Sequence, residues 1–289
     1  MSKKIIVITG PTGVGKTAVS LEIAKYLKSE IINCDASQFY RYLDIGTAKL
    51  KIEDQCNIPH HMIGFLNPLQ PYSIKEFQQD ARKLIEQIDI PILVGGSGLY
   101  INAVIYNYLL EASAHLHEDD ETQTNQELYA QLQEMDKDLA EKTHPNNRRR
   151  VIRYLQIARE KISYQKDPKL LYDVLFICLE RNREELYERI NMRCEQMFHD
   201  GWIRECIEIQ DMGYNLSAIK EIGYHEIGLY LDNKSSLQDT IFLIQQKTRH
   251  YAKRQLTWFR NKMDCQFIDI STTPLLNILS LVDDFLSTN

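Results

Sequence analysis

The 289-residue sequence lacks any run of about 18 uninterrupted apolar residues, so it offers no candidate membrane-spanning helix. Lys3 and Lys4 run directly into an apolar stretch, which does not fit a secretory signal peptide. The six cysteines show no paired metal-ligand spacing, so we expect free thiols. Positive charge is not in excess either, because the net charge of −6 argues against uniform binding to nucleic acid. These absences predict a cytoplasmic protein with no membrane association.

Residues 10–17 fit the phosphate-loop pattern of Gly, four residues and Gly-Lys-Ser/Thr. They follow an apolar run, Ile5 to Ile8, and precede a helical pattern, Ala18 to Leu27, which is the context that the motif requires. Backbone N–H groups of such a loop and the N-terminus of the following helix converge on phosphate oxygens. We predict that this phosphate loop binds a di- or triphosphate, with Lys16 neutralising charge and Thr17 holding Mg²⁺. Its residues are Gly10, Pro11, Thr12, Gly13, Val14, Gly15, Lys16 and Thr17.

Three further apolar runs predict strands at Ile31 to Ile32, Pro91 to Val94 and Val174 to Leu179, with helices between and after them. This alternation predicts an α/β fold, a P-loop NTPase-like parallel sheet flanked by helices. The composition changes at Leu110, and eight acidic residues against one basic residue lie between Glu118 and Asp138. We therefore expect residues 110–143 to form a small acidic helical insertion domain. Residues 1–109 and 144–289 would form the core, with a helical C-terminal part.

Polar residues follow the second predicted strand, where Asp35 and Ser37 would face the same crevice as the phosphate loop. An NTPase would place a metal-binding aspartate after the Pro91 to Val94 strand, but Gly95 to Ser97 follow it instead. Asp35 is then the one well-placed carboxylate. We interpret it as the general base of a transfer reaction, with a metal ligand or a strand-end cap as alternatives. The glycines would let the Ser97 hydroxyl approach a ligand closely.

Two basic segments suit a nucleic acid partner. The turn His144 to Asn147 opens a helix with Arg148, Arg149, Arg150 and Arg153. Between Lys247 and Lys262, six basic residues and no acidic ones are interleaved with Tyr251, Trp258 and Phe259. Cations follow a phosphate backbone while aromatic faces stack on bases, so this stretch indicates structured RNA or a single-stranded loop. Taken alone, an amphipathic helix with its aromatics in the core fits equally well.

The ordered motifs resemble those of the tRNA dimethylallyltransferases, also called tRNA isopentenyltransferases. The resemblance is carried by the phosphate loop, Asp35 to Gln38, Asp44 to Lys49, Pro59-His60-His61, Gly95 to Tyr100, His144 to Arg153, Ile222-Gly223-Tyr224 and Tyr251 to Arg260. It covers the chain from end to end except for the acidic insertion. The sequence departs from the family at Ser97, Gly64, Asn147 and His225, where Thr, Asp, Asp and Lys or Arg are common.

The resemblance implies transfer of a dimethylallyl group from dimethylallyl pyrophosphate to N6 of adenosine 37 beside the anticodon, with Mg²⁺ and release of pyrophosphate. Asp35 would accept the amine proton, Lys16 would stabilise the leaving group and Ser97 would hydrogen-bond a pyrophosphate oxygen. The implied partners are the tRNA anticodon stem-loop and dimethylallyl pyrophosphate, and we expect a monomer. The implied tRNA contacts are Asp35, Ala36, Ser37, Gln38, Ser97, Arg149, Arg150, Arg153, Lys220, Tyr224, His225, Lys253, Arg254, Gln255, Trp258 and Arg260.

Three other functions stay open at this point. A small-molecule kinase would bind ATP in the loop, but the missing strand-end aspartate counts against it. An adenylate isopentenyltransferase would modify a free nucleotide, and the basic, aromatic C-terminal helix counts against that. A nucleotide-switched RNA-binding protein without chemistry would not need Asp35. His60 and His61 are expected to order a loop rather than to contact substrate or metal.

Overall fold

The structure is a computed structural model that describes residues 2–108, 122–159 and 168–288. The chain divides into two compact units, Met1–Tyr106 with Leu170–Asn289 and Asn107–Lys169. Part of the expected acidic insertion, including Glu118, Asp119, Asp120 and Glu121, lies outside the described residues.

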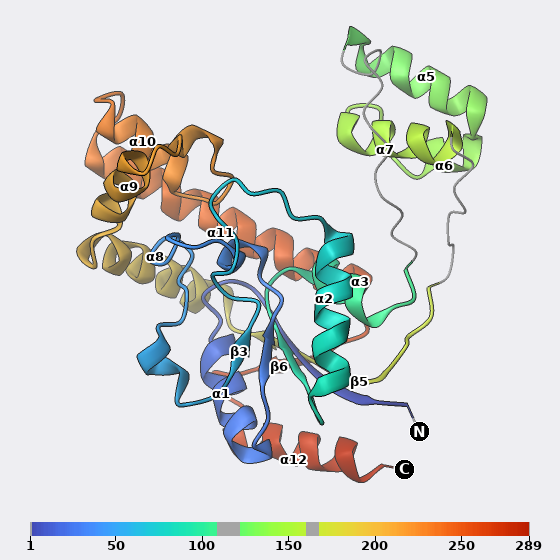
Figure 1. Ribbon diagram of the computed structural model, residues 1–289, viewed down its shortest axis with the longest axis vertical. Coiled ribbons are helices and arrows are strands. Elements are labelled where there is room, and N and C mark those ends of the chain that lie inside the picture. The colour runs from blue at the N-terminus through green and yellow to red at the C-terminus, as the bar shows by residue number, and fades with distance from the viewer. Residues whose placement is uncertain (1, 109–121, 160–167, 289) are drawn as a thin grey trace. The chain divides into compact units, whose positions relative to one another are not determined.

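The first unit is built on a six-stranded sheet in the order β3-β2-β4-β1-β5-β6, and all its strand pairs are parallel (Figure 1). The inner strand β1 (Lys4–Thr9) is fully buried from Ile5 to Ile8. An uninterrupted apolar run is required there because helices cover both faces of the sheet. The predicted α/β fold is confirmed. The strands are β1 (Lys4–Thr9), β2 (Ile31–Asn33), β3 (His60–His61), β4 (Ile92–Val94), β5 (Asp173–Glu180) and β6 (Gln266–Asp269).

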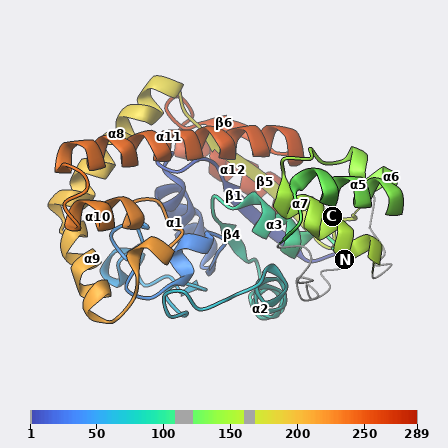
Figure 2. The same ribbon diagram turned by 90° about the horizontal axis from the view of Figure 1, so that it is seen from above.

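Helices cover both faces of the sheet. One face packs against α2 (Ile74–Gln87), α3 (Gly98–Ile105) and the end of α11 (Leu237–Lys262). The other packs against α1 (Lys16–Leu27), α8 (Arg183–His199) and α12 (Leu275–Ser287). The helix α11 runs across the unit from α10 (Tyr224–Leu231) to α3, so it can contribute side chains to several loops (Figure 2).

The C-terminal helical part has its own apolar core. It is formed by the end of α8, by α9 (Trp202–Asp211) and α10, and by the start of α11. Its largest buried side chains are Trp202 and Tyr224. Leu43, from the loop after β2, is buried in the same cluster. This packing fixes the loop after β2 against the helical part.

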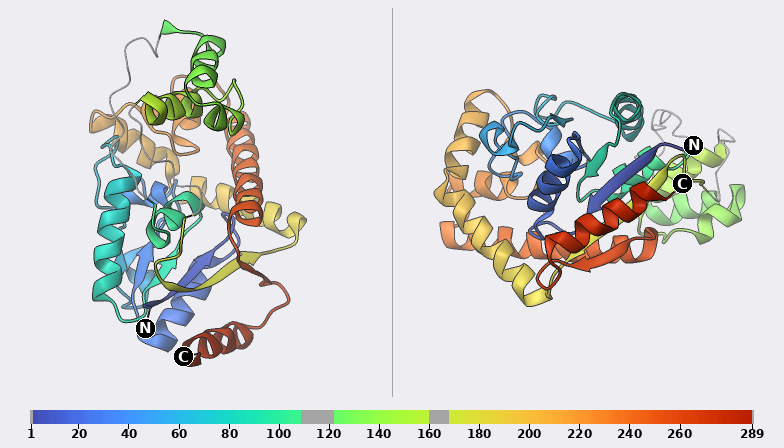
Figure 3. Two further views of the ribbon diagram at one scale, coloured as in Figure 1. Left: turned by 90° about the vertical axis from the view of Figure 1, so that its right-hand side faces the viewer. Right: turned by 90° about the horizontal axis from the view of Figure 1, so that it is seen from below.

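Sequence analysis missed β3 and β6, the two edge strands of the sheet. Each is short, and β3 has only two residues, so neither gives an apolar run that could be recognised. At the chain ends, Lys4 Nζ donates hydrogen bonds to the carbonyl oxygens of Phe285 (2.8 Å) and Leu286 (3.0 Å), which places β1 beside α12 (Figure 3). Within the described ranges, every helix is too short or too polar to cross a lipid bilayer.

The second unit contains α5 (Asn125–Met135), α6 (Lys137–Glu141) and α7 (Arg148–Arg159). Leu128 and Leu132 of α5 and Val151 and Leu155 of α7 are buried in one cluster. We expected α7 to belong to the core, which was to resume at residue 144. The structure places it in this unit instead, because its apolar stripe packs on α5.

Candidate active site

The phosphate loop joins β1 to α1, as predicted. Gly10 has φ +140°, and a Cβ there would lie 2.5 Å from the carbonyl oxygen of Leu179, so only glycine fits. Lys16 Nζ donates hydrogen bonds to the carbonyl oxygens of Gly10 and Pro11, both at 3.0 Å. Burial lowers the pKa of Lys16 to about 8, although the nearby charge of Asp35 opposes this effect. A bound phosphate would supply the negative charge that favours the protonated amine.

Two arginines of α8 add positive charge beside the loop, and sequence analysis missed both. Arg193 donates a hydrogen bond to the hydroxyl of Thr12 at 2.6 Å, and Arg189 donates one to the carbonyl oxygen of Gly13 at 3.1 Å. Burial lowers the pKa of Arg193, and Asp35 again acts in the opposite direction. The two arginines are four residues apart and so share one helix face, a spacing that could have drawn attention to them.

Lys16, Thr17, Asp35, Arg189 and Arg193 all line one cavity of about 370 Å³, the phosphate cavity. Its cations come from α1 and α8, and the loop itself contributes backbone groups. This composition suits an anion with several phosphate oxygens.

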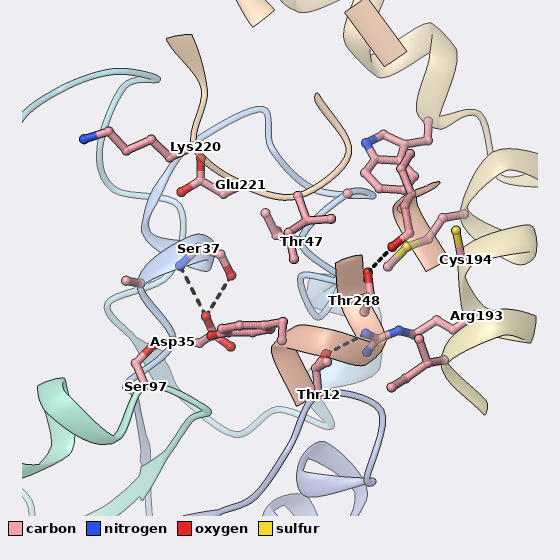
Figure 4. Close-up of a pocket in the computed structure, with 18 of the residues that line it drawn as sticks. Thr12, Asp35, Ser37, Thr47, Ser97, Arg193, Cys194, Lys220, Glu221 and Thr248 are labelled. Atoms are coloured by element: carbon pink, nitrogen blue, oxygen red, sulfur yellow. Dashed lines mark hydrogen bonds between the residues drawn. The ribbon is translucent and has the colours of Figure 1, made fainter. Parts of the chain in front are cut away.

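Asp35 lies just after β2, where sequence analysis placed it. Its backbone N–H donates to Asn33 Oδ1 at 3.0 Å. Its Oδ1 accepts hydrogen bonds from the Ser37 hydroxyl (2.7 Å) and the Ser37 backbone N–H (3.2 Å), which cap the short 3₁₀ helix Ala36–Phe39 (Figure 4). Within the described part of the chain, Oδ2 accepts no hydrogen bond. The carboxylate is therefore oriented through one oxygen, and the other is available to a ligand.

A second cavity of about 370 Å³, the reaction cavity, shares Asp35, Thr12, Thr47 and Arg193 with the phosphate cavity. Figure 4 shows Asp35 and Arg193 among the side chains that surround it. A ligand whose phosphates occupy the phosphate cavity could therefore extend its other end past Asp35 into this space.

Ser97 lies at the start of α3 and lines the reaction cavity. Tyr251 of α11 lines it as well, and its hydroxyl interacts with the side chains of Ser97 and Gln255. Burial raises the pKa of Tyr251, and the charge of Asp35 raises it further. We interpreted Tyr251 as one aromatic of an RNA-binding stretch, whereas the structure places it in the wall of this cavity.

Glu221 is a second carboxylate in the reaction cavity, and sequence analysis did not identify it as a site residue. Burial raises its pKa, and the negative charge of Asp35 contributes in the same direction. It comes from the turn before α10, more than 180 positions after Asp35, so no local pattern could have linked the two.

The structure contradicts the predicted tRNA contacts of Tyr224 and Gln255. Tyr224 is 0 % exposed, and its hydroxyl donates to Glu205 at 2.8 Å. Gln255 is 5 % exposed, and both ends of its amide bond backbone groups of Thr12 and Gly96. The glycines around Ser97 are also explained differently from our expectation. A Cβ on Gly96 would lie 2.2 Å from Gln255 Nε2, so this glycine makes room for α11 rather than for a ligand.

The other predicted tRNA residues stay predictions. Ala36, Ser37 and Gln38 belong to the 3₁₀ helix after Asp35. Lys220 lies in the turn before α10, and His225 is the second residue of that helix. On α11, Lys253, Arg254 and Arg260 are exposed and Trp258 is partly buried. Arg149, Arg150 and Arg153 belong to α7 in the second unit.

His60 and His61 form the edge strand β3. His60 Nδ1 lies 2.8 Å from the carbonyl oxygen of Ile58, and His61 Nε2 lies 2.5 Å from Glu30 Oε2. These contacts support the structural role that we expected. In the described ranges, no group of three or more His, Cys, Asp or Glu side chains is arranged to hold a metal ion.

The fold and the site define a phosphate-loop α/β protein. Its phosphate cavity shares lining residues with the reaction cavity, and no aspartate follows β4. That arrangement is typical of group transfer to an acceptor rather than of nucleotide hydrolysis. Residues 38–262 match the family described as IPP transferase, and the chain belongs to this family.

The chain is similar over almost its whole length to proteins named for one activity. It is 44 % identical to a tRNA dimethylallyltransferase from Anoxybacillus flavithermus, with 94 % of this chain and 92 % of that protein aligned. A crystal structure of a tRNA isopentenylpyrophosphate transferase from Bacillus halodurans is 37 % identical, with a TM-score of 0.76 and coverage of 98 % and 97 %.

A eukaryotic dimethylallyltransferase acting on tRNA is 30 % identical, with a TM-score of 0.87 and coverage of 99 % of this chain and 80 % of that one. The resemblance found from the motifs is thereby confirmed, as is the assignment to the class of tRNA dimethylallyltransferases.

Proposed function

We propose that this chain transfers the dimethylallyl group of dimethylallyl pyrophosphate to N6 of adenosine 37, beside the anticodon of tRNA. The observation that carries the proposal is that the phosphate cavity and the reaction cavity share Asp35. A diphosphate bound by Lys16 and Arg193 would extend its allylic carbon past this carboxylate. An amine that enters through the reaction cavity would meet the carbon beside the same group.

In the proposed step, the N6 lone pair forms a bond to C1 of the dimethylallyl group while the C1–O bond breaks. The electron pair of that bond leaves with pyrophosphate. Lys16 and Arg193 stabilise the charge that grows on the leaving group. The alkylated amine loses one proton, which the free oxygen of Asp35 accepts, and Ser97 hydrogen-bonds a pyrophosphate oxygen.

Mg²⁺ is the proposed cofactor, and the donors around the phosphate cavity fit it. Mg²⁺ keeps several waters and commonly binds through one or two protein oxygens together with substrate phosphates. Thr17 lines the phosphate cavity and would hold the ion through its hydroxyl. When bound, the ion would reduce the negative charge on the diphosphate.

The RNA partner is proposed to be the anticodon arm. Lys253, Arg254 and Arg260 would contact its phosphates, with Lys220, His225 and the arginines Arg149, Arg150 and Arg153. Extrusion of the reacting adenine from the loop costs a few kcal/mol, which these contacts would offset. We expect the protein to act as a monomer in the cytoplasm.

Incubation with labelled dimethylallyl pyrophosphate, Mg²⁺ and unmodified tRNA tests the proposal. Label should appear at one adenosine of the tRNA, and free pyrophosphate should form in equal amount. Label in AMP but not in tRNA would identify a free-nucleotide enzyme instead. Turnover of ATP without prenyl transfer would identify a kinase, and RNA binding without either reaction would leave no catalytic role for Asp35.

A further inference from the structure

A third cavity, of about 410 Å³, shares Lys220 and Glu221 with the reaction cavity. We call it the tyrosine cavity because Tyr40 and Tyr72 form part of its wall. Figure 4 shows the shared pair at one edge of the reaction cavity, with Arg193 at the other. The tyrosine cavity has no part in the proposed transfer step. Because it adjoins the reaction cavity at this shared pair, one bound polymer can reach both cavities.

Tyr72 is held in a fixed orientation. Its hydroxyl donates to Asp80 Oδ2 at 2.9 Å. Its ring makes edge contacts with Phe39 (centroids 5.7 Å apart, 85° between planes) and Phe65 (5.3 Å, 80°). A ring fixed in this way offers a surface for a planar group at little cost in side-chain entropy.

The rim of the tyrosine cavity carries an exposed apolar side chain on a strained backbone. Leu69 is 46 % exposed and has φ +63°, in the left-handed region that leucine rarely adopts. A turn holds it there, in which Gln70 N–H donates to the carbonyl oxygen of Asn67 (3.0 Å) and Asn67 N–H donates to Gln70 Oε1 (3.1 Å). The turn places Leu69 on the rim, next to the aromatic wall.

Polar groups in the wall have a consistent chemistry. Glu221 and Glu76 both line the wall, and Glu76 Oε2 already accepts a hydrogen bond from the Ser73 N–H at 2.7 Å. The remaining carboxylate oxygens are acceptors that favour ligands with N–H donors. Lys220 is exposed beside them and carries a positive charge suited to a phosphate. Stacking surfaces, acceptors for exocyclic amines and a neighbouring cation are together the features that bind an unstacked nucleotide.

We propose that the tyrosine cavity binds a second base of the same RNA, one with an exocyclic amine, which leaves the loop stack when the reacting adenine enters the reaction cavity. The inference rests on the proposed function, since it requires an RNA substrate. One strand can serve both cavities because they share the wall formed by Lys220 and Glu221. The second base would help to offset the cost of extruding the first.

The test combines protein variants with RNA stem-loops in which each nucleotide flanking the reacting adenosine is replaced, one at a time, by an abasic unit. Leu69→Asn removes the apolar side chain and suits the left-handed backbone, so the fold should be retained. Lys28→Asn, at another left-handed position in the C-cap of α1, is the matched control.

We expect Leu69→Asn to lower kcat/KM for the intact stem-loop about tenfold. One abasic position should cause a similar loss, and on that RNA Leu69→Asn should have no further effect. A uracil at this position should also reduce kcat/KM, because uracil lacks the amine. Lys28→Asn should change nothing.

At every abasic position, the loss of kcat/KM caused by Leu69→Asn could multiply with the loss caused by the abasic unit. That result would overturn the second-base site while leaving the transfer reaction intact. An unchanged rate for Leu69→Asn would do the same. Absence of transfer to any RNA would overturn the proposed function, and this inference with it.

Discussion

Gln255 of α11 accepts a hydrogen bond from the backbone N–H of Thr12 at 2.8 Å, so the longest helix of the first unit is tied directly to the phosphate loop. The other end of the same amide donates to the carbonyl oxygen of Gly96 at 2.9 Å. One buried side chain therefore sets the spacing between the phosphate loop and the segment that carries Ser97. Both loops contribute to the reaction cavity, so their spacing bears on catalysis.

Gln255→Ala should lower kcat/KM for dimethylallyl pyrophosphate by about tenfold or more, because it frees both loops and leaves the Thr12 N–H without its partner. The affinity for tRNA, measured by filter binding, should stay within about twofold of the unchanged protein, since Gln255 is buried. A large loss of tRNA affinity with an unchanged kcat/KM for dimethylallyl pyrophosphate would show that Gln255 contacts the RNA after all.

Arg254 precedes Gln255 in the chain, and we expect its removal to affect tRNA binding. It is exposed on α11, and its guanidinium lies 5.7 Å from the centre of the Tyr251 ring. Arg254→Ala should weaken tRNA binding and reduce the slope of log K against log salt by about 1, as expected for the loss of one phosphate contact. The control is Arg204→Ala, an exposed arginine of α9 that pairs with Glu208 at 2.9 Å. An equal change of slope in both variants would mean that the effect is not specific to Arg254.

The contrast between Gln255 and Arg254 shows what the sequence could reveal. The phosphate loop and Asp35 were predictable because a local pattern of strand, turn and helix places them. Motif membership, however, does not tell whether a side chain faces solvent, and so Tyr224 and Gln255 were placed wrongly on the RNA surface. The spacing of Arg189 and Arg193 marks one helix face, but the sequence does not show that this face lies against the phosphate loop, because α8 is distant from the loop in the chain.

Glu205 illustrates a buried charge with a positioning role. It accepts hydrogen bonds from the backbone N–H groups of Asp44 (2.9 Å), Ile45 (2.6 Å) and Gly46 (3.1 Å), and from the hydroxyl of Tyr224. Glu205→Ala would leave these donors without a partner and should lower the free energy of unfolding by about 3 kcal/mol. Glu205→Gln keeps an acceptor and should recover part of this loss. Urea denaturation at pH 7 compares the three proteins, and equal stability for all would exclude the role.

The same residue predicts a pH dependence. Burial raises the pKa of Glu205, while its hydrogen bonds act in the opposite direction. The folded state therefore binds more protons than the unfolded state between the ordinary and the raised pKa, so the contribution of Glu205 to stability falls as pH rises through this window. Urea midpoints measured between pH 4.5 and 7 should decline more in the unchanged protein than in Glu205→Gln. Parallel profiles would show that Glu205 does not titrate in this range.

Arg193→Ala should raise the KM for dimethylallyl pyrophosphate by about 10- to 100-fold, because it removes a partly buried guanidinium from the phosphate cavity and its hydrogen bond to Thr12. Arg193→Lys keeps the charge but loses the planar donor pair, so it should recover only part of the affinity. Isothermal titration with pyrophosphate measures binding without catalysis. Unaltered pyrophosphate affinity in Arg193→Ala would place the leaving group elsewhere.

Asp35→Asn should lower kcat by about 10² to 10⁴ and leave tRNA affinity nearly unchanged, because the amide cannot accept the amine proton. Ser37→Ala is the matched control, since it removes the 2.7 Å hydrogen bond that orients Asp35 but keeps the carboxylate. Its kcat should fall much less, because the carboxylate that accepts the proton is still present. Single-turnover transfer to an unmodified stem-loop separates the two effects. If Asp35→Asn retained its kcat, the proton would have to leave through another group, and Glu221 in the same cavity would be the next carboxylate to test.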